Sequence, residues 1–234
     1  MNYLSISDLH IGDGSKRDPW GRSNDLIVNL YELIIPLIES IRANETILVL
    51  NGDILELWGY NRSEVFKSYV FNQLMDLVDM LVSKVYYCIG NHDDALLPKI
   101  NDVYQYRKKF PDNMVFVDEY IEFTHGEIPV RFMHGNRFDK YNSEYTWVGR
   151  GATKAARLLG KINWRLESGA KRLVSRMGGN GRYSSDRISD QENYALRNGC
   201  CLVTGHTHRY RKDDSGLYHD SGTFLKGDFL EMEM

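Results

Sequence analysis

The stretch Gly90-Asn91-His92-Asp93 follows a run of β-branched and aromatic residues, Val85 to Ile89, that predicts a buried strand. A glycine directly after such a strand lets the backbone turn sharply, so the polar side chains behind it stand at the carboxyl edge of the sheet. Ligands of open α/β sheets bind at that edge. The stretch therefore predicts a functional site at the end of a central strand.

Four other strand-like runs end in polar residues in the same way. Tyr3–Ser7 is followed by Asp8-Leu9-His10, Ile47–Asn51 by Gly52-Asp53, Val130–Met133 by His134-Gly135, and Cys201–Thr204 by Gly205-His206-Thr207-His208. Five of the seven histidines therefore follow strand candidates. A single strand that ends in polar residues would indicate only a polar side chain with a local hydrogen-bond partner. Five strands that end in this way indicate that their carboxyl ends meet in one site.

Carboxylate, imidazole and amide side chains in one site favour Mn²⁺, Fe or Zn²⁺ over Ca²⁺ or Mg²⁺. In Asp8-x-His10 and His206-x-His208, residues two apart lie on the same face of an extended backbone, so each pair can converge on one ion. We therefore expect two divalent metal ions as cofactors, with Mn²⁺ as the first candidate.

In this order the motifs resemble those of the calcineurin-like metallophosphoesterases, over roughly residues 3–137 and 199–234. The resemblance implies a four-layer α/β/β/α sandwich. It also implies hydrolysis of a phosphodiester or pyrophosphate bond by in-line attack of a hydroxide that bridges the two metal ions. By resemblance, one ion is held by Asp8, His10, Asp53 and His208, and the second by Asp53, Asn91, His134 and His206. His92 and Asn91 are the implied catalytic residues, with His92 as proton donor or charge stabiliser at the leaving group.

Within that superfamily the chain is similar to the UDP-2,3-diacylglucosamine hydrolases and their relatives, which cleave a pyrophosphate bond in a nucleotide-linked lipid precursor. The similar features are Gly52–Trp58, Phe138-Asp139, a basic helical insertion and Gly205–Arg209. The chain departs from those enzymes at His92, where they typically carry Arg, at Asn136, where they carry Asp, and at Gly59–Arg62, where they are acidic. The resemblance therefore implies a nucleotide-linked or lipid-linked substrate without fixing it.

We expect one metallophosphoesterase domain over residues 1–234, with a helical insertion at about residues 139–190. From Thr153 to Met177, apolar residues recur at helical spacing, with breaks allowed at Gly160 and Gly169. The other positions carry Lys154, Arg157, Lys161, Arg165, Lys171, Arg172 and Arg176 against only Glu167. Two interpretations stay open. The insertion is either a solvated basic face packed on the domain or a lid that brings positive charge to a phosphate-bearing substrate or an anionic membrane surface. Its place between two metal-ligand motifs favours the lid.

Helical spacing also predicts helices over residues 24–43, from Ser63 to about Ser83 and, less regularly, over residues 98–110. Strands that alternate with helices predict a largely parallel sheet. A hairpin is expected around Gly216. We place His125 at a turn as a solvated residue and assign His219 no role.

The composition limits the function classes. The net charge of −3 and pI of about 6.2 argue against a basic nucleic-acid-binding protein as a whole, although a nuclease stays open because the insertion could track phosphates. Binding of single-stranded nucleic acid favours aromatic residues between the basic ones, and the basic segment of the insertion has only Trp164. A metal-bound scaffold without turnover would need a broken ligand set, and no ligand is missing.

The cellular location is expected to be cytoplasmic. The three cysteines fall in or beside buried strand candidates, as reduced core residues do. The first strand candidate begins at Tyr3, which leaves no room for a signal peptide, and no apolar run approaches the ~18 residues of a membrane span. The sequence does not fix the oligomeric state.

Overall fold

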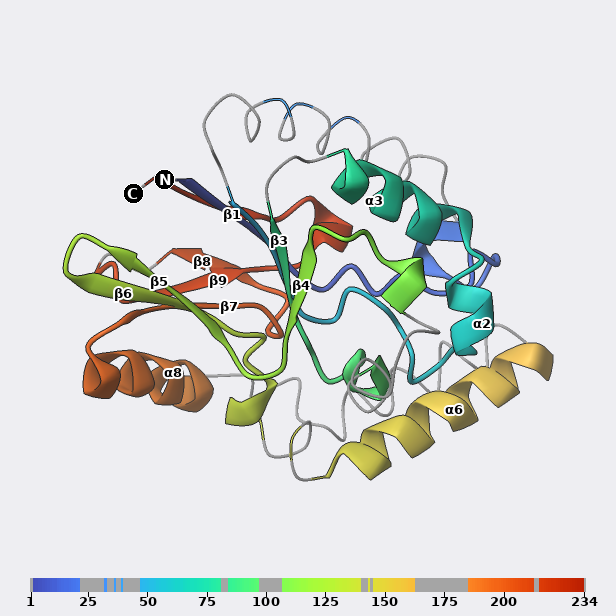
Figure 1. The fold of residues 1–234 in the computed structure, drawn as a ribbon. Helices are drawn as coiled ribbons and strands as arrows, with labels where there is room; N and C mark the ends of the chain where they lie inside the picture. Colours follow the sequence, from blue (N-terminus) through green and yellow to red (C-terminus); the bar gives the residue numbers. More distant parts are fainter. Residues whose placement is uncertain are drawn as a thin grey trace.

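The computed structural model describes residues 2–21, 32, 36, 39, 47–80, 84–96, 107–139, 143, 145–162, 185–212 and 215–233. Its strands form two five-stranded sheets, with the orders β10-β1-β2-β3-β4 and β5-β6-β7-β9-β8 (Figure 1). The first sheet contains β1 Asn2–Ile6, β2 Ile47–Asn51, β3 Val85–Cys88, β4 Met114–Val117 and β10 Leu230–Glu233. The second contains β5 Ile121–His125, β6 Ile128–Phe132, β7 Cys201–Thr204, β8 Tyr210–Lys212 and β9 Tyr218–Ser221.

The inner strands of both sheets are parallel, as the sequence predicted, and three of the four edge strands, β10, β5 and β8, are antiparallel. In the first sheet β1 to β4 are parallel and β10 pairs antiparallel with β1. In the second, β6, β7 and β9 are parallel, and β5 and β8 are the antiparallel edge strands. The β8–β9 pair is the hairpin expected around Gly216, with His219 buried in β9. The carboxyl ends of the parallel strands carry the residues predicted to form the site.

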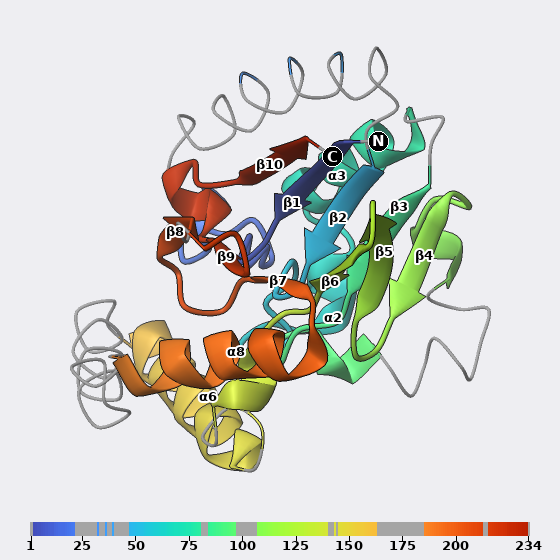
Figure 2. The same cartoon turned by 90° about the vertical axis from the view of Figure 1, so that its left-hand side faces the viewer.

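The alternation of side chains along each strand decides which layer it packs against. In β1, Leu4 points into a core shared with the helix α3 (Tyr69–Asp79), whereas Tyr3 points into a core between the sheets. The core between the sheets also contains Val49 and Cys88 of the first sheet and Val130, Phe132, Cys201 and Val203 of the second. On the far side of the second sheet, Ala195 of the helix α8 (Ser185–Asn198) packs with Leu202 and Tyr218. The order of layers is therefore helix, sheet, sheet, helix, which confirms the predicted fold class (Figure 2).

The single helix predicted from Ser63 to about Ser83 is wrong in its described part. The chain forms α2 (Arg62–Val65) and then α3, separated by three residues that end at Ser68. The Ser68 hydroxyl accepts a hydrogen bond from the backbone N–H of Phe71 at 3.2 Å and so caps the second helix. A serine in this position starts a new helix although the apolar spacing continues through it.

Two other predicted helices fall mostly outside the described residues. The helix over residues 24–43 is described only at residues 32, 36 and 39. The one over residues 98–110 is described only from Arg107, where Arg107–Lys109 forms a single 3₁₀ turn. Three further 3₁₀ turns, Pro19–Gly21, Asp94–Leu96 and Asn136–Phe138, lie in loops after β1, β3 and β6, and a fourth, Phe224–Lys226, precedes β10.

The insertion contains the helix α6 (Thr146–Ile162), which begins before the predicted start at Thr153. Residues 163–184 lie outside the described residues, and with them the predicted continuation to Met177 and the stop at 178–181. α8, which the sequence analysis did not assign, extends to Asn198, past the boundary expected near residue 190. No helix in the described ranges has both the length and the apolar character needed to cross a membrane.

Two glycines let α6 approach the loop that follows β2. A Cβ at Gly149 of α6 would lie 2.7 Å from the Trp58 ring, and one at Gly59 would lie 3.1 Å from Arg157 Cδ. Both approaches are closer than a side chain permits without movement. α6 is therefore packed directly against the loop that begins at Asp53.

Candidate metal centre

The strand ends bring the charged ligand candidates together. Three groups of side chains have ligand atoms within 4.8 Å of one another. The groups are Asp8, His10 and His208; His10, Asp53 and His92; and Asp53, His134 and His206. Residues from the ends of β1, β2, β3, β6 and β7 therefore converge across both sheets.

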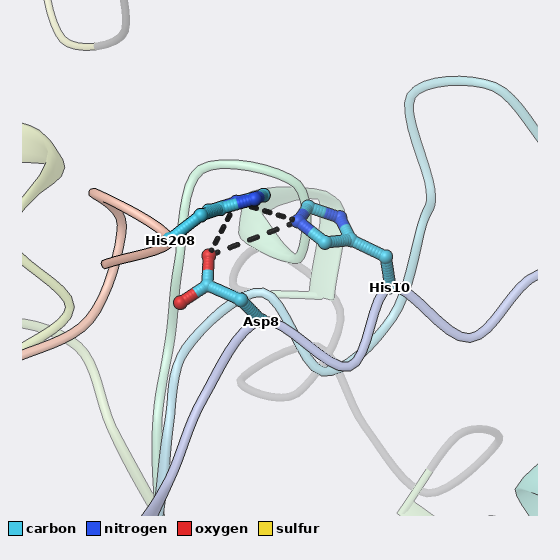
Figure 3. A group of neighbouring side chains, drawn as sticks. All are labelled: Asp8, His10 and His208. Carbon is cyan, nitrogen blue, oxygen red and sulfur yellow. Dashed lines mark hydrogen bonds and ion pairs between the residues drawn. The ribbon is translucent and has the colours of Figure 1, made fainter. Parts of the chain in front are cut away.

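The first group is formed by the ends of β1 and β7 (Figure 3). Its Asp8 carboxylate is fully buried, and the Oδ1 atom lies 3.0 Å from Nε2 of His208 and 3.7 Å from Nε2 of His10. The two imidazole Nε2 atoms are 3.3 Å apart. Three donor atoms therefore face one small volume, the arrangement that a metal ion requires.

The group of Asp53, His134 and His206 lies next to the first group, and Asp53 contacts both. Asp53 Oδ2 lies 3.1 Å from Nε2 of His134 and 4.0 Å from Nε2 of His10, which belongs to the first group. His206 Nε2 lies 3.3 Å from the buried Asp139 carboxylate. Asp53 thus stands between the two groups, within reach of donor atoms of both.

Asn91 is buried at the end of β3, and its Oδ1 atom accepts no hydrogen bond from any residue that the structure describes. Asp8 Oδ1 and His134 Nε2 are likewise buried without a well-aligned hydrogen bond, although each lies near a charged neighbour. A buried polar atom without a partner costs about 1–3 kcal/mol, so native proteins rarely retain one without a reason. The donor set and the unpaired Oδ1 atom of Asn91 therefore fit divalent metal ions.

The backbone is strained at the same residues. In the described part of the chain, the non-glycine residues with positive φ are Asp8 (56°), His10 (48°), Asp53 (52°), His206 (71°) and His208 (56°). Such conformations cost on the order of 1–3 kcal/mol each and persist only where neighbouring structure enforces them. Here the backbone N–H of Asp8 donates to the Gly52 carbonyl at 3.0 Å, and the N–H of His206 donates to Asp8 Oδ2 at 2.9 Å. The strain is thus confined to predicted metal ligands.

Glu56 is a site residue to which the sequence analysis assigned no role. Its Oε2 atom lies 2.8 Å from Nδ1 of His92 and 3.4 Å from Nδ1 of His10. The His92 ring also stacks on Trp58, with ring centroids 4.1 Å apart and planes at 21°. Glu56 and Trp58 both lie in the Gly52–Trp58 stretch that the sequence singled out, but only the fold shows that they contact His92.

The charges of the centre shift the pKa values of its members. Burial alone would lower the pKa of His134, but the Asp53 carboxylate raises it to about 9. Burial opposes the charged form of Asp53, yet His134 and His92 hold the pKa of Asp53 below its usual range. Burial lowers the pKa of His92, and the Glu56 and Asp53 carboxylates raise it above the ordinary value. The carboxylates therefore favour the protonated forms of His134 and His92, and these imidazoles favour the ionised form of Asp53.

Asp93 joins the two central loops. Its carboxylate accepts the backbone N–H of Leu55 at 2.7 Å and of Ile54 at 3.2 Å, just after Asp53. Burial, together with the nearby Asp53 charge, raises the pKa of Asp93 to about 7. Asp93 thus fixes the loop that carries Asn91 and His92 against the loop that carries Asp53.

A second buried carboxylate, Asp220 of β9, supports the loop between His206 and His208. It accepts the Thr207 hydroxyl at 2.6 Å and the backbone N–H of Gly222 at 2.8 Å. Burial raises the pKa of Asp220 well above its usual range. The folded chain therefore holds this proton more tightly than the unfolded chain does.

Replacing Asp220 by Asn is expected to change stability in a pH-dependent manner. A raised folded-state pKa contributes stability below the unfolded-state pKa of about 3.9, and this contribution is lost as the pH rises through the folded-state pKa. The unfolding free energy of Asp220→Asn, minus that of the wild type, should therefore increase from acid to alkaline pH. Urea unfolding in EDTA measures it, with Asp76→Asn on the exposed face of α3 as the control. A difference that falls with pH would contradict the raised pKa.

The chain is similar to known proteins over most of its length. The family model described as calcineurin-like phosphoesterase matches residues 1–210, which include every predicted ligand from Asp8 to His208. Vacuolar protein sorting 29 from Cryptosporidium parvum is 18% identical with a TM-score of 0.44, over 95% of this chain and 74% of that one. A predicted phosphoesterase from Streptococcus pneumoniae TIGR4 is 12% identical with a TM-score of 0.38, over 99% and 83%. An archaeal phosphodiesterase is 11% identical with a TM-score of 0.42, over 100% of both chains. No curated protein matches the chain.

Proposed function

The chain belongs to the calcineurin-like phosphoesterase family, and we propose that it hydrolyses a phosphodiester or pyrophosphate bond with two divalent metal ions. The observation that carries the proposal is the position of Asp53. Its carboxylate lies between one donor group at the ends of β1 and β7 and another at the ends of β6 and β7. A shared carboxylate of this kind supports two adjacent ions rather than one.

The residues near each group divide accordingly. Asp8, His10 and His208 would hold the first ion, His134, His206 and Asn91 the second, and Asp53 both. Mixed carboxylate, imidazole and amide donors favour Mn²⁺, with Fe and Zn²⁺ as the alternatives. When bound, such a pair lowers the pKa of a shared water to near neutrality and polarises the phosphoryl oxygen.

His92 and the residues that contact it would protonate the leaving group. Glu56 lies against Nδ1 of His92, which leaves the opposite ring nitrogen, Nε2, to give a proton to the departing oxygen. Trp58 stacks on the same imidazole and limits its rotation. Because the backbone N–H of His92 donates to Asp53 Oδ1 at 2.8 Å, the proton donor is also tied to the shared carboxylate.

The purified protein is expected to bind two metal ions per chain and to lose its activity in EDTA. Elemental analysis measures the stoichiometry, and re-addition of Mn²⁺, Fe²⁺ or Zn²⁺ after chelation should restore activity and rank the metals. One tightly bound ion together with full activity after chelation would contradict the two-ion proposal.

A panel of substrates with Mn²⁺ then tests the reaction class. The panel contains p-nitrophenyl phosphate, its bis ester, nucleotide diphosphate sugars, cyclic nucleotides and DNA. We expect turnover of diesters or pyrophosphates to exceed that of the monoester. Preferred hydrolysis of the monoester would overturn the proposed bond type while leaving the phosphoesterase assignment intact.

A further inference from the structure

Two cavities adjoin each other beside the metal centre. The smaller, of about 240 Å³, is lined by His10 and Glu56 of the centre and by Tyr60, Thr153 and Arg157. The larger, of about 610 Å³, lies between the loop of residues 13–17, the start of α2 and α6. Gly59 and Arg157 line both cavities. A substrate that reaches the metal centre through the smaller cavity therefore has the larger one as its neighbour.

The larger cavity is basic although the whole chain has a net charge of −3. Its lining carries four basic side chains, Lys16, Arg17, Lys154 and Arg157, and two acidic ones, Asp13 and Glu64. The Asp13 carboxylate is turned to its own loop, where it accepts the backbone N–H of Ser15 at 3.0 Å. Lys16 and Arg17 on one side of the cavity and Lys154 and Arg157 on another favour an anion between them.

The structure fixes Arg157 at the boundary of the two cavities. Its guanidinium donates to the Gly59 carbonyl and lies over the Tyr60 ring. Lys154 precedes it by three residues on α6, so both side chains lie on one face of the helix. The cations are thus presented by a helix whose position is set by its contact with the loop after Asp53.

We propose that the substrate carries a second phosphate group, and that this group binds in the larger cavity against Lys154 and Arg157 while the scissile phosphorus lies at the metal centre. The inference rests on the proposed function, and it specifies the substrate class as a phosphoester with two separate phosphate groups. The second phosphate contributes binding in both the ground state and the transition state, so it lowers KM more than it raises kcat.

A matched pair of chromogenic diesters tests this. Thymidine 5′-(p-nitrophenyl phosphate) and its 3′-phosphorylated derivative release the same leaving group and differ only in one phosphate. With the Mn²⁺ enzyme we expect the 3′-phosphate to lower KM about tenfold, the gain typical of a charge-assisted contact. Lys154→Gln should remove most of that gain and leave KM for the unphosphorylated diester unchanged, and Lys154→Arg should retain the gain.

Lys109→Gln is the matched control, because Lys109 is exposed and lines neither cavity. It should leave the effect of the 3′-phosphate intact. Equal KM values for the two diesters in the wild type, or equal effects of Lys154→Gln and Lys109→Gln, would overturn the inference.

Calorimetric titration of the metal-free protein separates this inference from the proposed function. Thymidine 3′,5′-bisphosphate should bind more tightly than thymidine 5′-monophosphate, and Lys154→Gln should abolish the difference. Failure of hydrolysis together with this binding result would reject the proposed reaction and keep the anion site. Hydrolysis together with equal binding of the two nucleotides would reject the anion site alone.

Discussion

Replacing Asn91 or His208 by alanine is expected to lower kcat by about 10³-fold or more and to remove one of the two bound ions. Metal-assisted charge stabilisation is worth several kcal/mol in the transition state, and each 1.36 kcal/mol corresponds to a factor of ten. Asn91 Oδ1 is buried without a hydrogen bond from any described residue, and His208 Nε2 is one of three donor atoms that face the same volume. Steady-state kinetics and elemental analysis of the same preparations measure both effects.

His125→Ala provides the comparison for these two variants. His125 is the last residue of β5, an edge strand, and its position follows no ligand motif. We expect the kcat of this variant to stay within about threefold of the wild type, because the substituted residue is not among the proposed ligands. Comparable losses in all three variants would mean that the centre has been assigned to the wrong residues.

Replacing His92 by Asn is expected to lower kcat by about 10²–10⁴-fold on a diester with an alkyl leaving group, the usual contribution of a general acid. The same variant should lose less than about tenfold on a p-nitrophenyl ester, since p-nitrophenolate departs without protonation. Both ions should remain bound because His92 is not among the proposed ligands. The two substrates are compared under saturating conditions with the same Mn²⁺ preparation.

The dependence on the leaving group separates the two roles implied for His92. A proton donor gives a large loss with the alkyl ester and a small one with the p-nitrophenyl ester. Equal losses on both esters would assign His92 to stabilisation of the phosphoryl charge instead, and no loss on either would remove it from the mechanism.

The convergence of the strand ends could be predicted because each one combines two local signals. A hydrophobic run such as Val85–Ile89 specifies a buried strand, and the polar residues after it must then lie at the sheet edge. The layer order was predicted only from the resemblance to a known family, and the structure shows it in β1, where Leu4 and Tyr3 point to opposite faces. The positions of the ligand candidates at the sheet edge follow from the strand patterns.

The remaining features depend on contacts between segments that are distant in the sequence or on single polar residues. α8 was not predicted because its sequence is polar, and on the second sheet Ala195 packs in a small cluster with Leu202 and Tyr218. Ser68 interrupts a continuous apolar pattern by one side-chain hydrogen bond to Phe71. Glu56 lies in a loop with no periodicity, and its contact with His92 joins residues that only the parallel pairing of β2 and β3 brings together.

The contact of Gly149 with Trp58 has a consequence for how this protein could diverge. The Trp58 ring packs against Gly149 of α6, and the same ring stacks on His92. Exchange of the insertion for that of a related protein would therefore alter the environment of His92 as well as the cavity wall. The helix that lines the proposed substrate cavity and the loop that holds His92 share one aromatic ring, so we expect substitutions in α6 that change the cavity to be accompanied by substitutions around Trp58.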